Sequence, residues 1–180
     1  IDFENVDKED KDALTQFVRE AAPLLREQGL VVSIDINTHP CYDREALAEA
    51  VDYVMIMAYD QHWKGGGKAG SLAQLVWVEN IIKEFLKTIP RDKFILGIPL
   101  YTRLWIEELN EEGGISLSSK ALSMEEARKV VEENKAEVLW DDESGQFYAE
   151  FKEGNTTNKI WIEDVNSINL KSSLVHKYKL

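Results

Sequence analysis

The feature that most constrains the fold is an alternation of short apolar runs with amphipathic helical segments over the first 105 residues. Short apolar runs predict buried strands at 30–36, 52–59 and 94–100, and the first of them is rich in β-branched residues. Apolar residues recur at helical spacing in the intervening segments and before the first run, at 10–28, 43–50 and 72–88. The opening Ile1-Asp2-Phe3-Glu4 alternates as a strand does. This order predicts an α/β fold of parallel units joined by right-handed crossovers.

The pattern changes after Trp105. An acidic, Gly-containing link is expected there, then a helix over 123–134 and three short strands near 137–140, 146–152 and 158–162. Asp164 can cap a last helix that runs to about Lys177. The sequence therefore predicts three parts, which are a β/α part over 1–105, an α+β insertion over 106–162 and a returning helix over 163–180.

Charge and composition exclude several classes of protein. The chain has 21 Lys and Arg residues against 33 Asp and Glu residues, a formal net charge of −12, which argues against a nucleic-acid partner. Its apolar runs are far shorter than the roughly 20 residues that span a bilayer, so we expect no membrane segment and no signal peptide. Cys41 is the only cysteine, and the three histidines lack ligand spacing. We therefore expect no metal and no cofactor.

Polar residues stand where the expected parallel strands end, which is where β/α folds carry reactive side chains; they are Glu4, Asp35, Tyr59, Asp60 and Tyr101. Asp2 and Glu4 are two apart on a strand and so share a face, where two carboxylates perturb each other's pKa. One can then stay protonated as an acid while the other is ionised. The alternative is that both belong to a solvated terminus.

Three motifs together resemble glycoside hydrolase family 18. Met57, Tyr59 and Asp60 match the M-x-Y-D pattern of its sixth barrel strand. Gly97, Pro99, Tyr101, Arg103 and Trp105 match G-x-P-x-Y-x-R-x-W of the seventh. Ile1 to Asn5 is similar to the end of the D-x-x-D-x-D-x-E motif of the fourth, with Glu4 at the catalytic-acid position. The resemblance covers the whole chain. Segments 58–63 and 159–164 are most similar to the spore-cortex-lytic N-acetylglucosaminidase branch.

The resemblance implies a partial (β/α)8 TIM barrel, about strands four to seven, with an α+β insertion domain. The family's first three strands and its last strand have no counterpart in the chain. We therefore expect the isolated chain to be inactive and to self-associate through open sheet edges. The resemblance also suggests a protein that is extracellular, in the cell wall or spore-associated.

The resemblance assigns catalysis to Glu4, Asp2 and Tyr59. In this substrate-assisted chemistry the 2-acetamido oxygen of the sugar attacks C1, so the enzyme needs no nucleophile of its own. The same resemblance implies that substrate is bound by Met57, Asp60, Tyr101, Arg103 and Trp105. An aromatic residue at a strand end more often packs in a core than supports a sugar. For the last three residues we weigh the two roles about evenly, and both stay open.

Other residues receive weaker assignments. His62 and Trp63 stand beside a Gly-rich loop and could line the cleft. Trp77, Trp140 and Trp161 are predicted to pack in the core. The expected function is a glycosidase acting on N-acetylglucosamine-containing glycans, either peptidoglycan or a chitin-like polysaccharide. The alternative is a non-catalytic glycan-binding or assembly module.

Overall fold

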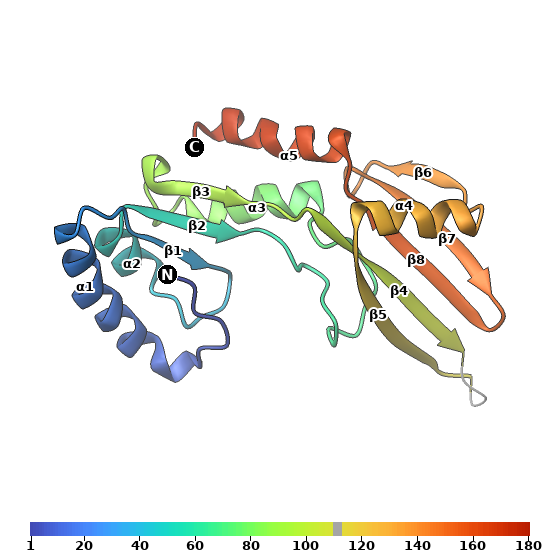
Figure 1. Cartoon of the computed structure of the whole chain (residues 1–180), viewed down its shortest axis with the longest axis horizontal. Helices are drawn as coiled ribbons and strands as arrows, with labels where there is room; N and C mark the ends of the chain where they lie inside the picture. Colours follow the sequence, from blue (N-terminus) through green and yellow to red (C-terminus); the bar gives the residue numbers. More distant parts are fainter. Residues whose placement is uncertain (110–112) are drawn as a thin grey trace. The chain divides into compact units, whose positions relative to one another are not determined.

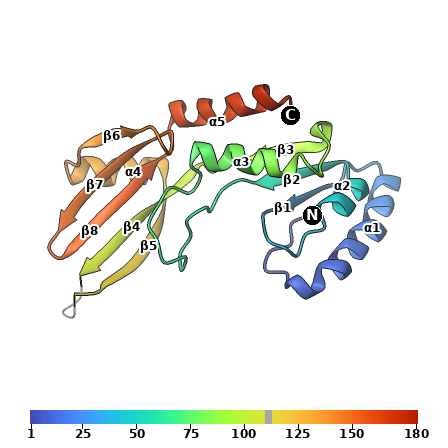
Figure 2. The same cartoon turned by 180° about the vertical axis from the view of Figure 1, so that it is seen from behind.

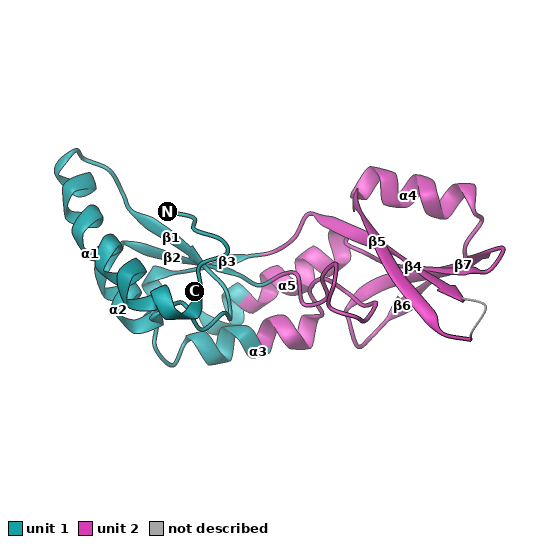
Figure 3. Ribbon diagram, turned by 90° about the horizontal axis from the view of Figure 1, so that it is seen from below, with its two compact units in different colours: residues 1–58, 80–97, 175–180 teal, residues 59–79, 98–174 magenta. Residues whose placement is uncertain are grey.

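The computed structural model describes residues 1–109 and 113–180. The chain divides into two compact units, shown in different colours in Figure 3. Unit 1 consists of residues 1–58, 80–97 and 175–180, and unit 2 of residues 59–79 and 98–174. Two helices cross between the units, α3 (Leu75–Phe85) and α5 (Val165–Tyr178).

Unit 1 contains a parallel sheet. Its strands lie in the order β1 (Ser33–Ile36), β2 (Tyr53–Met57) and β3 (Phe94–Gly97), and every pair is parallel (Figure 1). Asp2 forms an isolated parallel bridge with Asp35, so the N-terminal segment continues the sheet beyond β1. The predicted α/β fold with parallel strands is therefore confirmed for this unit.

The unit 1 helices occur where the periodicity predicts them. They are α1 (Lys11–Glu27) and α2 (Arg44–Ala50), with single 3-10 turns η1 (Lys8–Asp10) and η2 (Arg91–Lys93). Val18 of α1 and Leu47 of α2 are fully buried, as are alternate residues of β1 and β2 such as Ile36 and Ile56. The apolar helix faces and one face of the strands are thus removed from water.

Unit 2 contains a five-stranded antiparallel sheet in the order β5-β4-β8-β7-β6 (Figure 2). Its strands are β4 (Tyr101–Leu109), β5 (Ile115–Ser123), β6 (Val138–Asp141), β7 (Gln146–Glu153) and β8 (Thr156–Ile162). Helix α4 (Met124–Glu133) packs on one face through Ala127 and Val131, against Leu122, Ala149 and Ile160. That layer is the core of the unit.

The β4–β5 pair is the main difference from the expected elements. The predicted link after Trp105 is strand as far as Leu109, and β4 pairs with both β5 and β8. The acidic pair Glu107-Glu108 and the serines of β5 hide the strand pattern, because residues of these types do not form the apolar or β-branched runs that indicate a strand. Residues 110–112 of the predicted link lie outside the described residues. The predicted domain boundaries at 105 and 162 stay a prediction.

The start and the interior of α5 are held by side chains. Asp164 accepts hydrogen bonds from the backbone N–H groups of Asn166 and Ser167, at 3.0 and 2.9 Å, which confirms the predicted cap. One turn further, Lys171 Nζ lies 2.6 and 2.9 Å from the two carboxylate oxygens of Glu163. Ser167 Oγ donates to the same carboxylate at 2.6 Å. Glu163 and Lys171 are 2% and 0% exposed, so the pair is removed from water.

No helix within residues 1–109 and 113–180 combines the length and apolar character that a membrane span requires.

Trp140 and Trp161, which the sequence predicts to pack in the core, differ in how far they are buried. Trp140 is 37% exposed, so that prediction is wrong for it. Trp161 is half-buried on the sheet face that α4 does not cover.

Candidate functional site

The N-terminal segment carries the two carboxylates that the sequence singled out. The bridge between Asp2 and Asp35 and a 2.9 Å hydrogen bond from Asp35 N to Ile1 O fix this segment beside β1. Asp2 and Glu4 are both exposed. The structure therefore holds Glu4 two residues past a paired position, where its carboxyl group reaches solvent.

Asp35 and Tyr42, which lie near this segment, have raised pKa values. Burial, and then the neighbouring Asp2 carboxylate, raise the pKa of Asp35. The Tyr42 hydroxyl donates to Phe3 O at 3.0 Å. Burial first, and then the charges of Cys41, Asp2 and Glu4, raise the pKa of Tyr42 to about 12. Tyr42 is thus a neutral hydrogen-bond donor that fixes the backbone between the two catalytic candidates.

Tyr42 was missed by sequence reasoning. The one available signal was its position shortly after the carboxyl end of a predicted strand, in the segment that follows Asn37. Its contact with Phe3 spans 39 residues of sequence, and no local pattern encodes it.

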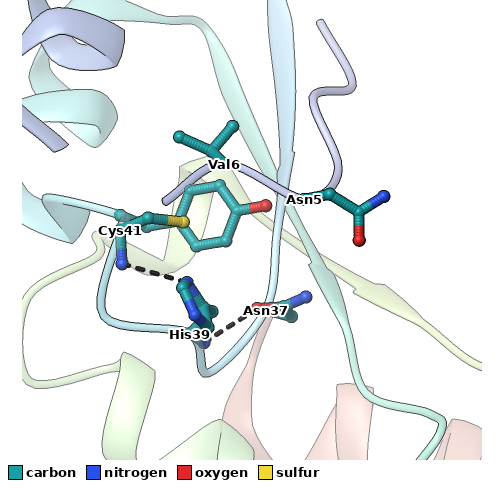
Figure 4. Close-up of a pocket in the computed structure, with 6 residues that line it drawn as sticks. Asn5, Val6, Asn37, His39 and Cys41 are labelled. Atoms are coloured by element: carbon teal, nitrogen blue, oxygen red, sulfur yellow. Dashed lines mark hydrogen bonds between the residues drawn. The ribbon is translucent and has the colours of Figure 1, made fainter. Parts of the chain in front are cut away.

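A small pocket lies beside this segment (Figure 4). Its volume is about 180 Å³, and its lining residues are Asn5, Val6, Asn37, His39, Cys41 and Tyr42. Asn37 Oδ1 accepts from His39 N at 2.8 Å, and His39 Nδ1 accepts from Cys41 N at 3.3 Å. A neutral His39 ring therefore carries its proton on Nε2. Burial raises the pKa of the Cys41 thiol, which keeps it protonated.

Replacing Asp35 by Asn should stabilise the chain at neutral pH. A carboxyl group whose folded pKa is raised costs stability once the pH rises past its unfolded value of 3.8, and the full cost is present above the folded pKa. The gain in melting temperature should therefore be larger at pH 7 than at pH 3, as measured by thermal unfolding at both values.

Asp52 supplies the matched control for Asp35. Its carboxylate accepts from Val32 N at 2.8 Å and from Arg26 Nε at 3.0 Å, and the backbone hydrogen bond is the largest cause that lowers its pKa. Asp52→Asn should therefore lower the melting temperature, and more so at pH 7 than at pH 3. An equal gain for Asp35→Asn at both pH values would contradict the electrostatic explanation.

A second group of candidates lies in unit 2. The Tyr101 hydroxyl donates to Asp60 Oδ1 at 2.6 Å, and the Tyr59 and Tyr101 rings meet edge to face with centroids 6.5 Å apart. Burial, and then the hydrogen bond to Asp60, raise the pKa of Tyr101. Asp60 has a φ of 57°, a left-handed backbone that turns the chain just after β2. The structure thus brings three predicted residues, Tyr59, Asp60 and Tyr101, into one cluster.

Arg103 and Trp105 follow on the same strand as Tyr101. Trp105 is 1% exposed, and its indole N–H donates to Gly70 O at 2.8 Å, which favours the packing role of the two that the sequence left open. Arg103 Nη1 lies 3.5 Å from Ser119 Oγ, while its buried Nε has no hydrogen-bond partner among the described residues. A buried donor of this kind is a group that a ligand can satisfy.

The remaining candidates lie at the end of β2 and in the loop that follows it. Met57 is half-buried and pairs with Gly97 of β3 in the parallel ladder. The His62 Nδ1–H donates to Ser71 O at 2.7 Å, and Trp63 is largely exposed. Within the described residues no group of three or more His, Cys, Asp or Glu side chains could hold a metal ion.

A comparison with known families gives the class of protein. The profile described as "Glycosyl hydrolases family 18" matches residues 1–180, and the chain belongs to this family.

Relatives from spore-forming bacteria are among the similar proteins. YdhD of Bacillus subtilis, whose name describes a sporulation-specific glycosylase, is 29% identical to this chain. The matched region covers 100% of this chain and 44% of YdhD. The cortical fragment-lytic enzyme of the same organism is 26% identical, with coverages of 100% and 43%. The crystal structure of the spore cortex-lytic enzyme SleL of Bacillus cereus matches with a TM-score of 0.84 and 26% identity, over 99% of this chain and 42% of that one. The chain thus spans about half the length of the curated relatives it matches.

Proposed function

We propose that this chain carries the catalytic acid and part of the substrate cleft of a hydrolase that cleaves N-acetylglucosamine linkages by the substrate-assisted, retaining route. The observation that carries the proposal is the family match over all 180 residues, with Glu4 exposed at the end of a segment paired to a parallel sheet. Exposure matters because a general acid must reach the glycosidic oxygen.

The proposed reaction has two steps. In the first, the 2-acetamido oxygen of the sugar attacks C1, the C1–O bond to the leaving sugar breaks, and Glu4 gives its proton to the leaving oxygen. In the second, water attacks C1 of the cyclic oxazolinium ion, and the Glu4 carboxylate takes the proton from that water. Asp2 accepts the acetamido N–H and stabilises the positive charge of the ion. In the first step the nucleophile is the substrate's own acetamido oxygen, and in the second it is water, so no protein side chain acts as nucleophile.

The tyrosine cluster of unit 2 supports the assigned binding roles. We assign to the Tyr59 hydroxyl the task of holding the acetamido oxygen in line for its attack. Tyr101 is held by its 2.6 Å hydrogen bond to Asp60, and its raised pKa keeps it a neutral donor. Arg103 Nε, which has no partner within residues 1–109 and 113–180, offers a further donor for a sugar oxygen. Met57 and Trp105 would support this surface from behind, since one is half-buried and the other buried.

The finer description of the fold is also a proposal. We assign the segment 1–4 and strands β1, β2 and β3 to barrel strands four to seven of a family 18 (β/α)8 barrel, and the sheet of unit 2 to its α+β insertion. The parallel order of β1 to β3 and the antiparallel order of β4 to β8 support this assignment. Loss of activity in the isolated chain and pairing through its sheet edges stay predictions.

We propose peptidoglycan of the spore cortex as the substrate, in a protein associated with the spore or exported from the cell. The names of the cortical fragment-lytic and cortex-lytic relatives support this choice. The acetamido group that the reaction needs is present in chitin as well, so the catalytic residues alone do not separate the two glycans.

The test compares two substrates on the full-length protein that contains this chain. We expect faster turnover, measured as kcat/KM, on purified cortex muropeptides than on chitooligosaccharides of equal length. Faster turnover on chitooligosaccharides would assign the protein to the chitinases instead. Binding of both glycans without turnover of either would contradict the enzymatic proposal and support a glycan-binding module.

A further inference from the structure

The sheet of unit 2 carries a row of apolar and aromatic side chains on the face opposite α4. Strands β6, β7 and β8 are neighbours in the sheet (Figure 2), and Leu139, Tyr148 and Trp161 are directly paired across them. Paired residues point to the same face. The core residues Ala149 and Ile160, next along the same strands, point to the other face, where α4 packs. We call Leu139, Tyr148 and Trp161 the β6–β8 aromatic row.

The aromatic row is accessible. Leu139 is 57% exposed, and Tyr148 and Trp161 are half-buried. The two rings lie 4.7 Å apart between centroids and are tilted by 46°, so they form one continuous aromatic surface. A cavity of about 360 Å³ lies over the row and is also lined by Trp140 and Asp141. This volume is in the range of small-molecule binding sites.

Two carboxylates border the aromatic surface. Glu150 Oε2 accepts the Tyr148 hydroxyl at 2.6 Å, and Asp141 Oδ2 accepts the Trp161 indole N–H at 3.4 Å. Asp141 Oδ1 also accepts from Glu143 N at 3.2 Å. Both carboxylates keep further acceptor capacity, since an ionised carboxyl group accepts about four hydrogen bonds. The nearby Lys159 does not add free positive charge, because its ammonium group lies 2.7 Å from Glu107 Oε2. The site therefore offers ring faces and hydrogen-bond acceptors but little attraction for an anion.

A neutral sugar fits this combination. A pyranose has an apolar C–H face that stacks on an aromatic ring and a rim of hydroxyl and amide donors that carboxylates accept. A peptide strand is a poorer occupant, because the edge strand β6 has only four residues to pair with. Acidic sugars are disfavoured by Asp141 and Glu150 and by the net charge of −12.

We propose that the β6–β8 aromatic row is a second glycan-binding site, which takes a neutral N-acetylhexosamine unit of the chain that is being cleaved. The inference rests on the proposed function, which supplies the class of ligand. All its residues lie in unit 2, and none is among the predicted catalytic or substrate-binding residues. A second contact on one polymer raises the effective concentration of the glycan at the protein.

The test is a titration of the ¹⁵N-labelled 180-residue chain with N-acetylchitotetraose, followed by NMR. The indole N–H resonances, assigned by substituting each tryptophan in turn, report where the sugar binds. We expect the Trp161 indole resonance to shift with added tetraose. Tyr148→Ala should raise the dissociation constant, measured from the Trp161 resonance, about tenfold, because it removes one stacking ring. Tyr148→Phe should change this constant little.

Val138 supplies the control within the same strand. It precedes Leu139, is 40% exposed and points to the opposite face, so Leu139→Ala should weaken binding and Val138→Ala should not. Leu139→Ala also serves if Tyr148→Ala fails to fold. A shift of other indoles without Trp161, no shift at all, or equal binding by Val138→Ala and Leu139→Ala would each overturn the inference. The proposed function is judged separately, by turnover of the full-length protein.

Discussion

Lys171→Ala should lower the free energy of unfolding by about 3–5 kcal/mol, the usual cost of removing one partner of a buried ion pair. The ammonium group lies 2.6 Å from Glu163 Oε1, and both residues are almost completely buried. Burial lowers the pKa of Lys171, and the Glu163 carboxylate opposes that shift. Without Lys171 the carboxylate would keep, among the residues that the structure describes, only Ser167 as a hydrogen-bond donor. The measurement is the midpoint of urea unfolding at unchanged slope.

An exposed ion pair of similar length supplies the control. Lys129 and Glu125 are four residues apart on α4 and 2.7 Å from each other, but both are exposed to solvent. Lys129→Ala should therefore cost no more than about 0.5 kcal/mol. The double variant Lys171→Met with Glu163→Leu should recover most of the loss, since apolar residues of similar volume replace both charges. A loss below about 1 kcal/mol for Lys171→Ala would show that water reaches the pair.

Glu4→Gln in the full-length protein should lower kcat by about 10²-fold or more, the usual contribution of a general acid. Glutamine has nearly the same shape but no proton to give to the leaving oxygen. Because Glu4 is exposed, the melting temperature should be unchanged, and KM should change far less than kcat.

Glu9→Gln is the control for Glu4→Gln. Glu9 is an exposed carboxylate in η1, five residues further along, and removing its charge should leave kcat unchanged. Near-normal turnover by Glu4→Gln on both muropeptides and chitooligosaccharides would mean that another residue is the acid. An equal loss in the two variants would point to the overall charge of the segment instead.

Elements whose pattern is local could be predicted from the sequence. The helical spacing of α1, the apolar runs of β1 to β3 and the Asp164 cap of α5 depend on residues within a few positions of one another. The motifs around Glu4, Asp60 and Tyr101 could be matched to a family because each occupies one short stretch of chain. Nothing in the described residues contradicts those matches, and the roles they assign await the substitutions above.

Burial and pairing across distant segments required the tertiary structure. Strand β4 is polar at Glu107 and Glu108, and it is a strand there because β5 and β8 pair with it on either side. Lysine and glutamate are residue types usually found on the surface, and only the packing around α5 removes Lys171 and Glu163 from water. Trp161 is of a residue type expected in a core, yet its register in β8 places its side chain on the sheet face opposite α4. The physical reason is common to all three: side-chain type sets what burial costs or gains, and long-range contacts decide which side chains are buried.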